Sequence, residues 1–188
     1  MKNKVKLIVN PFIRIAGGQA LIWGFLGLIV STLLCWISGY HYHGLLHFGP
    51  APNPAWWCYL AEHLIVWLIP ALLFYLGGLF LSHSRIRVID VLGTVLFAQL
   101  PLLGMNLISL LPAMRMMSQM NMNMSPEEML AQPYFILAMI LTLLGLPFLI
   151  LTLIWMFNAL KVSCNLKQWK LWTCLLYTSP SPRDPKTS

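Results

Sequence analysis

Four long apolar runs constrain the fold of this chain more than any other feature of its sequence. They extend over about residues 19–38, 56–81, 88–111 and 134–160. A helix rises 1.5 Å per residue, so roughly 20 apolar residues are needed to cross about 30 Å of hydrocarbon. Each run meets that length. The sequence therefore predicts an all-α fold, a polytopic bundle of four transmembrane helices within one membrane domain over residues 16–173.

The composition agrees with a lipid-facing surface. Hydrophobic residues make up 59% of the chain and charged residues only 9%, whereas a soluble domain carries about 25% charged residues. The net charge of +7 does not indicate a nucleic-acid partner, because the basic residues form short clusters between the apolar runs rather than one patch. We expect membrane lipids as partners and no nucleic acid.

The distribution of basic residues predicts the orientation in the membrane. If every run spans, one side carries nine basic residues and the other carries Arg115 alone. Cytoplasmic loops are enriched in Lys and Arg, so we expect a multi-pass protein of the cell membrane with a cytoplasmic N-terminus. Residues 1–15 mix Lys with apolar residues and are predicted to lie at the cytoplasmic interface. The nine basic residues are Lys2, Lys4, Lys6, Arg14, Arg85, Arg87, Lys161, Lys167 and Lys170.

The segment 174–188 differs in character from the rest of the chain. Its string from Cys174 through Tyr-Thr-Ser-Pro-Ser-Pro-Arg-Asp resembles one reading frame of a sequencing-library adapter. We therefore interpret it as a non-native tail and exclude it from fold reasoning; the alternative is a disordered Ser/Pro-rich tail. If the natural sequence stops near Thr173, we expect that a fifth helix has been truncated.

Several short segments together resemble a known family. They are Val9-Asn10-Pro11-Phe12, the stretch 90–94, Gln99-Leu100-Pro101 and the stretch 155–163. In combination they resemble the bacterial members of the Yip family, over about residues 5–173. The resemblance implies a five-helix membrane protein with a cytoplasmic N-terminus and little defined chemistry. The chain lacks the Asp-Leu-Tyr-Gly-Pro-type motif of eukaryotic relatives, so a GTPase partner is not implied.

Polar residues inside the apolar runs are the first functional candidates. Gln99 and Asn106 lie seven residues apart and therefore project from nearly the same helix face. They could line a polar path, but we favour hydrogen bonds between helices. For Asp90 we favour a helix-start carboxylate at the interface over a proton relay. Glu62 and His63 lie one to two turns inside the second run, where an ionisable group marks function by default; both could also reach headgroups, and both interpretations stay open.

The loops predicted on the outer side contain a second set of candidates. Imidazole and thioether groups are suitable copper ligands, and thioethers favour Cu(I). A copper site combining both loops is one interpretation. The other, which we favour, is interfacial histidines and an apolar methionine loop lying on the membrane. The candidate ligands are His41, His43, His47, Met120, Met122 and Met124.

The sequence contains none of the common enzyme motifs, such as Gly-x-Ser-x-Gly, His-Glu-x-x-His or a phosphate-binding loop. We therefore predict a protein that is not an enzyme and has no cofactor. Our leading hypothesis is a Yip-like membrane protein that acts through helix packing and through contacts with lipids, a second copy or another membrane protein. The rival hypothesis is a small transporter or channel, with Glu62, Gln99 and Asn106 along an internal path.

Overall fold

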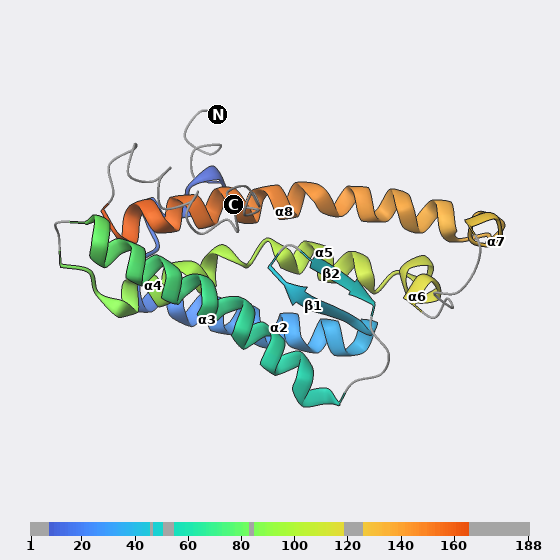
Figure 1. Cartoon of the computed structure of the whole chain (residues 1–188), viewed down its shortest axis with the longest axis horizontal. Coiled ribbons are helices and arrows are strands. Elements are labelled where there is room, and N and C mark those ends of the chain that lie inside the picture. Colours follow the sequence, from blue (N-terminus) through green and yellow to red (C-terminus); the bar gives the residue numbers. More distant parts are fainter. Residues whose placement is uncertain (1–7, 46, 51–54, 83–84, 119–125, 166–188) are drawn as a thin grey trace, which may run out of the picture.

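The computed structural model describes residues 8–45, 47–50, 55–82, 85–118 and 126–165. Long helices run side by side along the long axis of the molecule (Figure 1). Four helical segments are long and apolar enough to cross a membrane, namely Gly17–Ser38, Trp56–Phe80, Val88–Ser109 and Phe135–Ser163. The predicted fold class is confirmed: the protein is an all-α, multi-pass membrane bundle.

Successive spans run antiparallel, which gives the bundle two ends. The hairpin end carries a two-stranded sheet, and the arginine end carries Arg85 and Arg87. The long elements are α2 (Gly17–Ser38), α3 (Trp56–Leu81), α4 (Val88–Ala98), α5 (Leu102–Ser109) and α8 (Phe135–Ser163). The short elements are η1 (Pro11–Ile13), α6 (Pro112–Ser118), α7 (Pro126–Leu130), β1 (Tyr40–Gly44) and β2 (His47–Pro50).

The third span is broken, although the sequence predicted one helix over 88–111. The backbone N–H groups of Gln99 and Leu100 bond to the carbonyls three residues earlier, which tightens the turn at the end of α4. Pro101 follows directly, and it has no N–H to continue the α-helical ladder. The span therefore consists of α4 and α5 joined by a tight turn at membrane depth.

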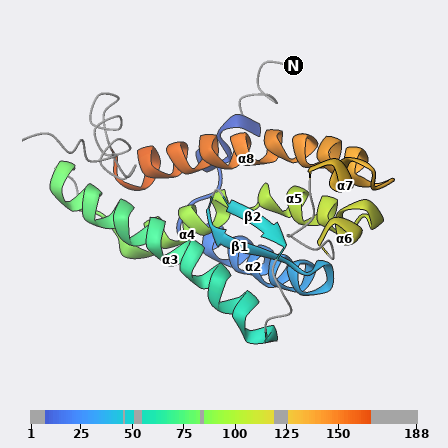
Figure 2. The same cartoon turned by 45° about the vertical axis from the view of Figure 1, so that its right-hand side comes forward.

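The first outer loop contains a β-hairpin, for which the sequence analysis made no prediction. Gly39 ends α2 with a left-handed φ of 74° and donates its N–H to the carbonyl of Cys35. The chain then forms an antiparallel hairpin with Tyr40 opposite Pro50 and Tyr42 opposite Phe48. The hairpin lies against the helices instead of extending away from them (Figure 2). Its strand β1 is buried at its first three residues.

At the arginine end, α2 and α4 approach so closely that only glycine fits. A Cβ on Gly93 would lie 2.5 Å from the carbonyl oxygen of Gly17, and one on Gly24 would lie 2.8 Å from the backbone nitrogen of Phe97. The N-terminal segment packs here too, because Phe12 is buried against the rings of Phe97 and Trp155. Two stretches of the family resemblance, 9–12 and 155–163, are thus in contact.

Candidate functional site

Most of the buried polar side chains lie at the hairpin end, where two groups of them can be distinguished. The first group, the polar network, consists of Tyr42, Asn106, Ser31 and His63. The second is the pair formed by His41 and Glu62. Each group brings together elements that are distant in sequence.

The polar network forms one directed chain of hydrogen bonds. Tyr42 donates its hydroxyl to Asn106 Oδ1 at 2.6 Å, and Asn106 Nδ2 donates to Ser31 Oγ at 2.5 Å. His63 continues the chain, with Nε2 2.7 Å from Ser31 Oγ and Nδ1 2.7 Å from the carbonyl oxygen of Tyr59. A carbonyl can only accept, so Nδ1 carries the hydrogen and Nε2 accepts from the Ser31 hydroxyl in the neutral ring. In this arrangement each of the four residues donates one hydrogen bond to the next acceptor in the chain.

The network links α2, β1, α3 and α5 through side chains alone. Hydrogen bonds of this kind strengthen one another in a low-dielectric interior, and leaving one buried partner unpaired costs about 1–3 kcal/mol. The favoured interpretation of Asn106, a bond between helices, agrees with this geometry. His63 had been left open between a functional group and a residue that reaches the headgroups, and here it bonds to Ser31 of α2. Ser31 and Tyr42 were not singled out from the sequence. For Tyr42, the one available signal of a strand was the alternation of tyrosine and histidine over 40–43.

Two hairpin tyrosines are kept as hydrogen-bond donors by burial. Desolvation raises the pKa of Tyr42 well above its usual value, and it raises the pKa of Tyr40 to about 12. Tyr40 donates its hydroxyl to the carbonyl oxygen of Met114 at 3.0 Å, which fixes the hairpin to α6. Both phenols therefore remain protonated throughout the physiological pH range.

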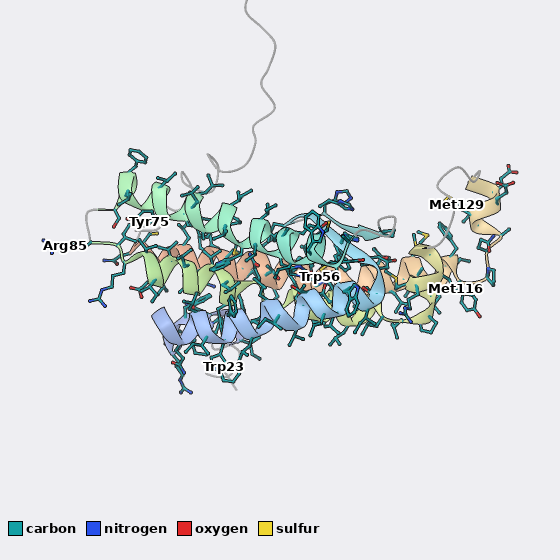
Figure 3. The ribbon with its side chains drawn as sticks, turned by 90° about the horizontal axis from the view of Figure 1, so that it is seen from below. Trp23, Trp56, Tyr75, Arg85, Met116 and Met129 are labelled. Carbon is teal, nitrogen blue, oxygen red and sulfur yellow. The ribbon has the colours of Figure 1, made fainter. Side chains whose placement is uncertain are left out.

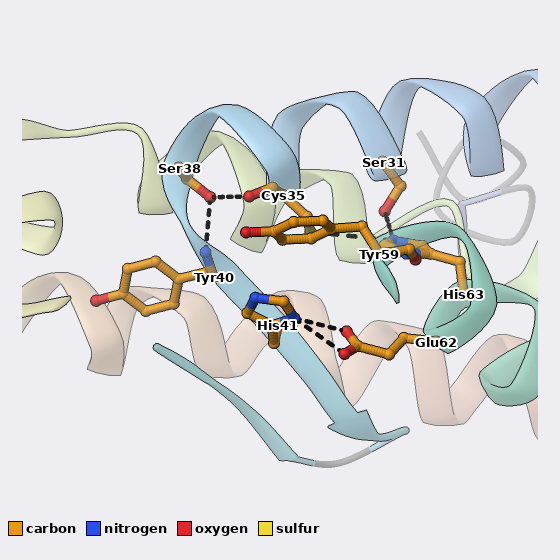
Figure 4. Close-up of polar contacts among 8 residues, drawn as sticks. All are labelled: Ser31, Cys35, Ser38, Tyr40, His41, Tyr59, Glu62 and His63. Atoms are coloured by element: carbon orange, nitrogen blue, oxygen red, sulfur yellow. Dashed lines mark hydrogen bonds and ion pairs between the residues drawn. The ribbon is translucent and has the colours of Figure 1, made fainter. Parts of the chain in front are cut away.

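The second group places a buried imidazole against a partly exposed carboxylate. His41 is 1% exposed, and its Nδ1 lies 2.9 and 3.0 Å from the two carboxylate oxygens of Glu62 (Figure 4). Its ring stacks on Tyr59 with centroids 4.1 Å apart. Its other nitrogen, Nε2, is buried without a hydrogen-bond partner among the described residues. The arrangement therefore fixes the orientation of the imidazole through Nδ1 and through the stacked ring of Tyr59.

The three predicted histidine ligands lie near one another. The ring centroids of His41 and His43 are 6.2 Å apart, and those of His43 and His47 are 5.0 Å apart. Across the part of the chain that the structure describes, no three His, Cys, Asp or Glu residues are arranged to hold a metal ion. Met120, Met122 and Met124 lie outside the described residues. The copper site stays a prediction.

Gln99 has a partner that explains its position. Pro70 lies inside α3 and lacks an N–H, so the carbonyl of Val66, four residues earlier, loses its intrahelical donor. The side chain of Gln99 donates from Nε2 to that carbonyl oxygen at 2.9 Å. Polar side chains of neighbouring helices often compensate for a proline in this way. The favoured interpretation of Gln99, a bond between helices, agrees with this contact.

Asp90 lies apart from the other candidates, in the first turn of α4 at the arginine end. Its carboxylate is directed toward α2, since a Cβ on Gly17 would lie 2.9 Å from Oδ1. An acidic group in the first turn is favourable because it faces the positive end of the helix dipole. The structure does not bring Asp90 together with Glu62 or Asn106.

A small cavity adjoins the polar network. Its volume is about 20 Å³, and its polar lining comes from Ser31, Tyr42, His63 and Gln99. A cavity needs roughly 10–15 Å³ to hold one water molecule. The space beside the network therefore fits about one water.

Comparison with known proteins adds no assignment. No family model, curated protein sequence or solved structure matches the chain.

Proposed function

We propose that this chain is a Yip-like, multi-pass protein of the bacterial cell membrane that acts without catalysis, through helix packing and through contacts with lipid or protein. The sequence resemblance supports the family, and the antiparallel four-helix bundle is compatible with it. The observation that carries the proposal is the pairing of the intramembrane polar residues with one another or with backbone. Asn106, His63 and Gln99 each bond to a neighbouring element.

The apolar helix faces support the same function. Only 17% of the most apolar window of α8 is buried within the bundle, against 50% for the α4–α5 span. Large side chains such as Leu143 and Ile150 are more than half exposed along α8. Without water around it, such a surface must contact lipid tails or another apolar helix. We propose that α8 presents the main contact surface of the protein.

The orientation is part of the proposal. Arg85 and Arg87 share one end of the bundle with Arg14 and Lys161, whereas Arg115 lies at the hairpin end. The excess of basic residues at the arginine end supports a cytoplasmic location of that end. The N-terminus is then cytoplasmic.

Site-directed photo-crosslinking in native membranes tests the proposed contact surface. A photoreactive residue at Leu143 or Ile150 is expected to yield a discrete protein adduct or abundant lipid adducts. The matched control is the same residue at Leu26, which is exposed to a similar degree on α2. Equal and featureless labelling at all three positions contradicts a specialised role of α8.

A transporter or channel remains the second candidate, because one observation favours it. His41 has a buried nitrogen without a described partner, and it is bound to the partly exposed carboxylate of Glu62. Such a pair could exchange protons or bind a cation. Reconstitution in proteoliposomes distinguishes the two functions. Solute or proton flux that is lost in Glu62→Gln supports transport, and the absence of flux together with α8 adducts supports the contact function.

A further inference from the structure

A second, larger cavity lies between α3 and α4 toward the arginine end. Its volume is about 240 Å³, and its lining is almost entirely apolar. An engineered cavity of about 150 Å³ is already large enough to bind benzene. The lining residues include Leu68, Leu72 and Tyr75 of α3 and Val88, Val91 and Leu92 of α4.

The cavity is a partly open groove between α3 and α4. It follows α3 from Leu68 to Tyr75, which corresponds to about 10 Å at 1.5 Å per residue. Next to the lining residues Leu68 and Leu92, Trp67 Nε1 donates a hydrogen bond to the carbonyl oxygen of Leu92 at 3.0 Å, which ties α3 to α4. The end of the groove at Tyr75 and Val88 lies at the arginine end. An apolar groove of this length suits a hydrocarbon chain.

Two arginines lie next to the end of this groove that is formed by Tyr75 and Val88. Arg87 directly precedes the lining residue Val88, and Arg85 lies two residues further away, at the same end of the molecule as Tyr75 (Figure 3). Both arginines are exposed, and neither forms an ion pair within the described part of the chain. The nearby carboxylate of Asp90 lies against Gly17 of α2 and forms no ion pair with either arginine. An exposed guanidinium beside an apolar groove is suited to a phosphate.

We propose that the α3–α4 groove binds one anionic phospholipid, with an acyl chain in the cavity and the phosphate on Arg85 and Arg87. The inference rests on the proposed function, because it names one of the lipids that the protein contacts. A free phosphate would satisfy the arginines but would leave the apolar groove empty. The groove length and the charge at its mouth are both explained by a lipid.

Native mass spectrometry of the detergent-purified full chain tests the proposal. The probes are phosphatidylglycerol and phosphatidylcholine with identical acyl chains, added at equal concentration. Because two basic groups contact one anionic headgroup, we expect phosphatidylglycerol to bind at least about tenfold more tightly than phosphatidylcholine. An excess of glycerol 3-phosphate, which has the headgroup chemistry without the chains, is expected not to displace it.

Variants separate the two halves of the proposed site. Arg85→Gln/Arg87→Gln is expected to abolish the headgroup preference. The matched control, Arg14→Gln/Lys161→Gln, removes the same charge from exposed positions outside the groove. It is expected to retain the preference for phosphatidylglycerol. Leu72→Trp fills the groove from a lipid-exposed position and is expected to lower retention of both lipids. Val88→Phe, also half-exposed, provides a second test of the groove should Leu72→Trp fail to fold.

Three results would overturn the proposal. They are equal losses in the two double variants, unchanged retention when the groove is filled, and displacement by glycerol 3-phosphate. None of these results affects the α8 cross-linking or the flux measurement, so failure of the lipid site can be told apart from failure of the proposed function.

Discussion

The two ends of this bundle are built from the same helices but are stabilised by different interactions. At the hairpin end, side chains from four elements join in directed hydrogen bonds that end at His63. At the arginine end, the buried hydroxyl of Thr94 bonds only to carbonyls of its own helix, and α2 meets α4 through glycine and apolar side chains. The bonds between elements there run singly from a side chain to a backbone carbonyl, as from Trp67 to Leu92. We conclude that a connected network of side chains stabilises the hairpin end, whereas the contact of α2 with α4 at the arginine end depends mainly on residue size.

The largest effect is expected from Gly93→Leu. A Cβ at this position would already lie 2.5 Å from a backbone oxygen and 3.0 Å from a backbone nitrogen of α2, and backbone cannot move aside as a flexible side chain can. We expect a loss of about 3 kcal/mol or more in the free energy of unfolding, measured by thermal denaturation in detergent. Gly18→Leu is the control, since a Cβ there meets nothing within 4 Å. Similar stability of the two variants would contradict the size-determined interface.

Asn106→Leu should have the next largest effect. It preserves side-chain volume approximately but leaves the Tyr42 hydroxyl without an acceptor and removes the donor to Ser31. We expect a loss of about 2 kcal/mol. Tyr42→Phe alone should lower the free energy of unfolding by less than Asn106→Leu does. In the Asn106→Leu background it should lower it hardly at all, because the acceptor of the Tyr42 hydroxyl is already missing. Additive losses in this cycle would show that the network is not coupled.

Gln99 lies between the two ends of the bundle. Gln99→Leu should lower the free energy of unfolding by about 1 kcal/mol, because the Val66 carbonyl loses its donor. Pro70→Ala restores a backbone N–H to that carbonyl. In the Pro70→Ala background, Gln99→Leu should therefore be nearly neutral. The double-mutant cycle is measured by the same denaturation assay. An undiminished cost in that background would refute the compensation of Pro70 by Gln99.

The smallest effect is expected from Thr94→Val. Its hydroxyl donates to the carbonyls of Asp90 and Val91, which also accept backbone hydrogen bonds within α4. Valine has nearly the same shape as threonine. We expect a change within about 0.5 kcal/mol. A loss as large as that of Asn106→Leu would remove the distinction between the two ends.

The sequence predicted the spans well because lipid imposes a simple rule on them. A backbone crossing hydrocarbon must satisfy its own polar groups, so length and hydropathy are sufficient to locate a helix. The second predicted span, 56–81, agrees with α3 at both ends, and the first begins within two residues of α2. The break at Gln99–Pro101 was not predicted, since a single proline in an apolar run is compatible with either a kink or a break.

The site was harder to predict, because it depends on contacts between distant segments. Gln99 and Asn106 were found from their polarity within an apolar run. Their partners could not be found in this way, since Ser31 is an ordinary small residue in α2 and Tyr42 lies in a loop that folds back on the bundle. The dependence of Gln99 on Pro70 requires knowing that α3 and α4 are neighbours. Register between helices is a tertiary property that one sequence does not specify.

The antiparallel arrangement that separates the two ends can be tested by labelling from one side of the membrane. A single cysteine is placed at His47 or at Arg85, both exposed, in a background without native cysteines, and intact cells are treated with a membrane-impermeant maleimide. We expect the cysteine at 47 to react in intact cells and the cysteine at 85 to react only after permeabilisation. Reaction of both from the same side would contradict the four-span architecture.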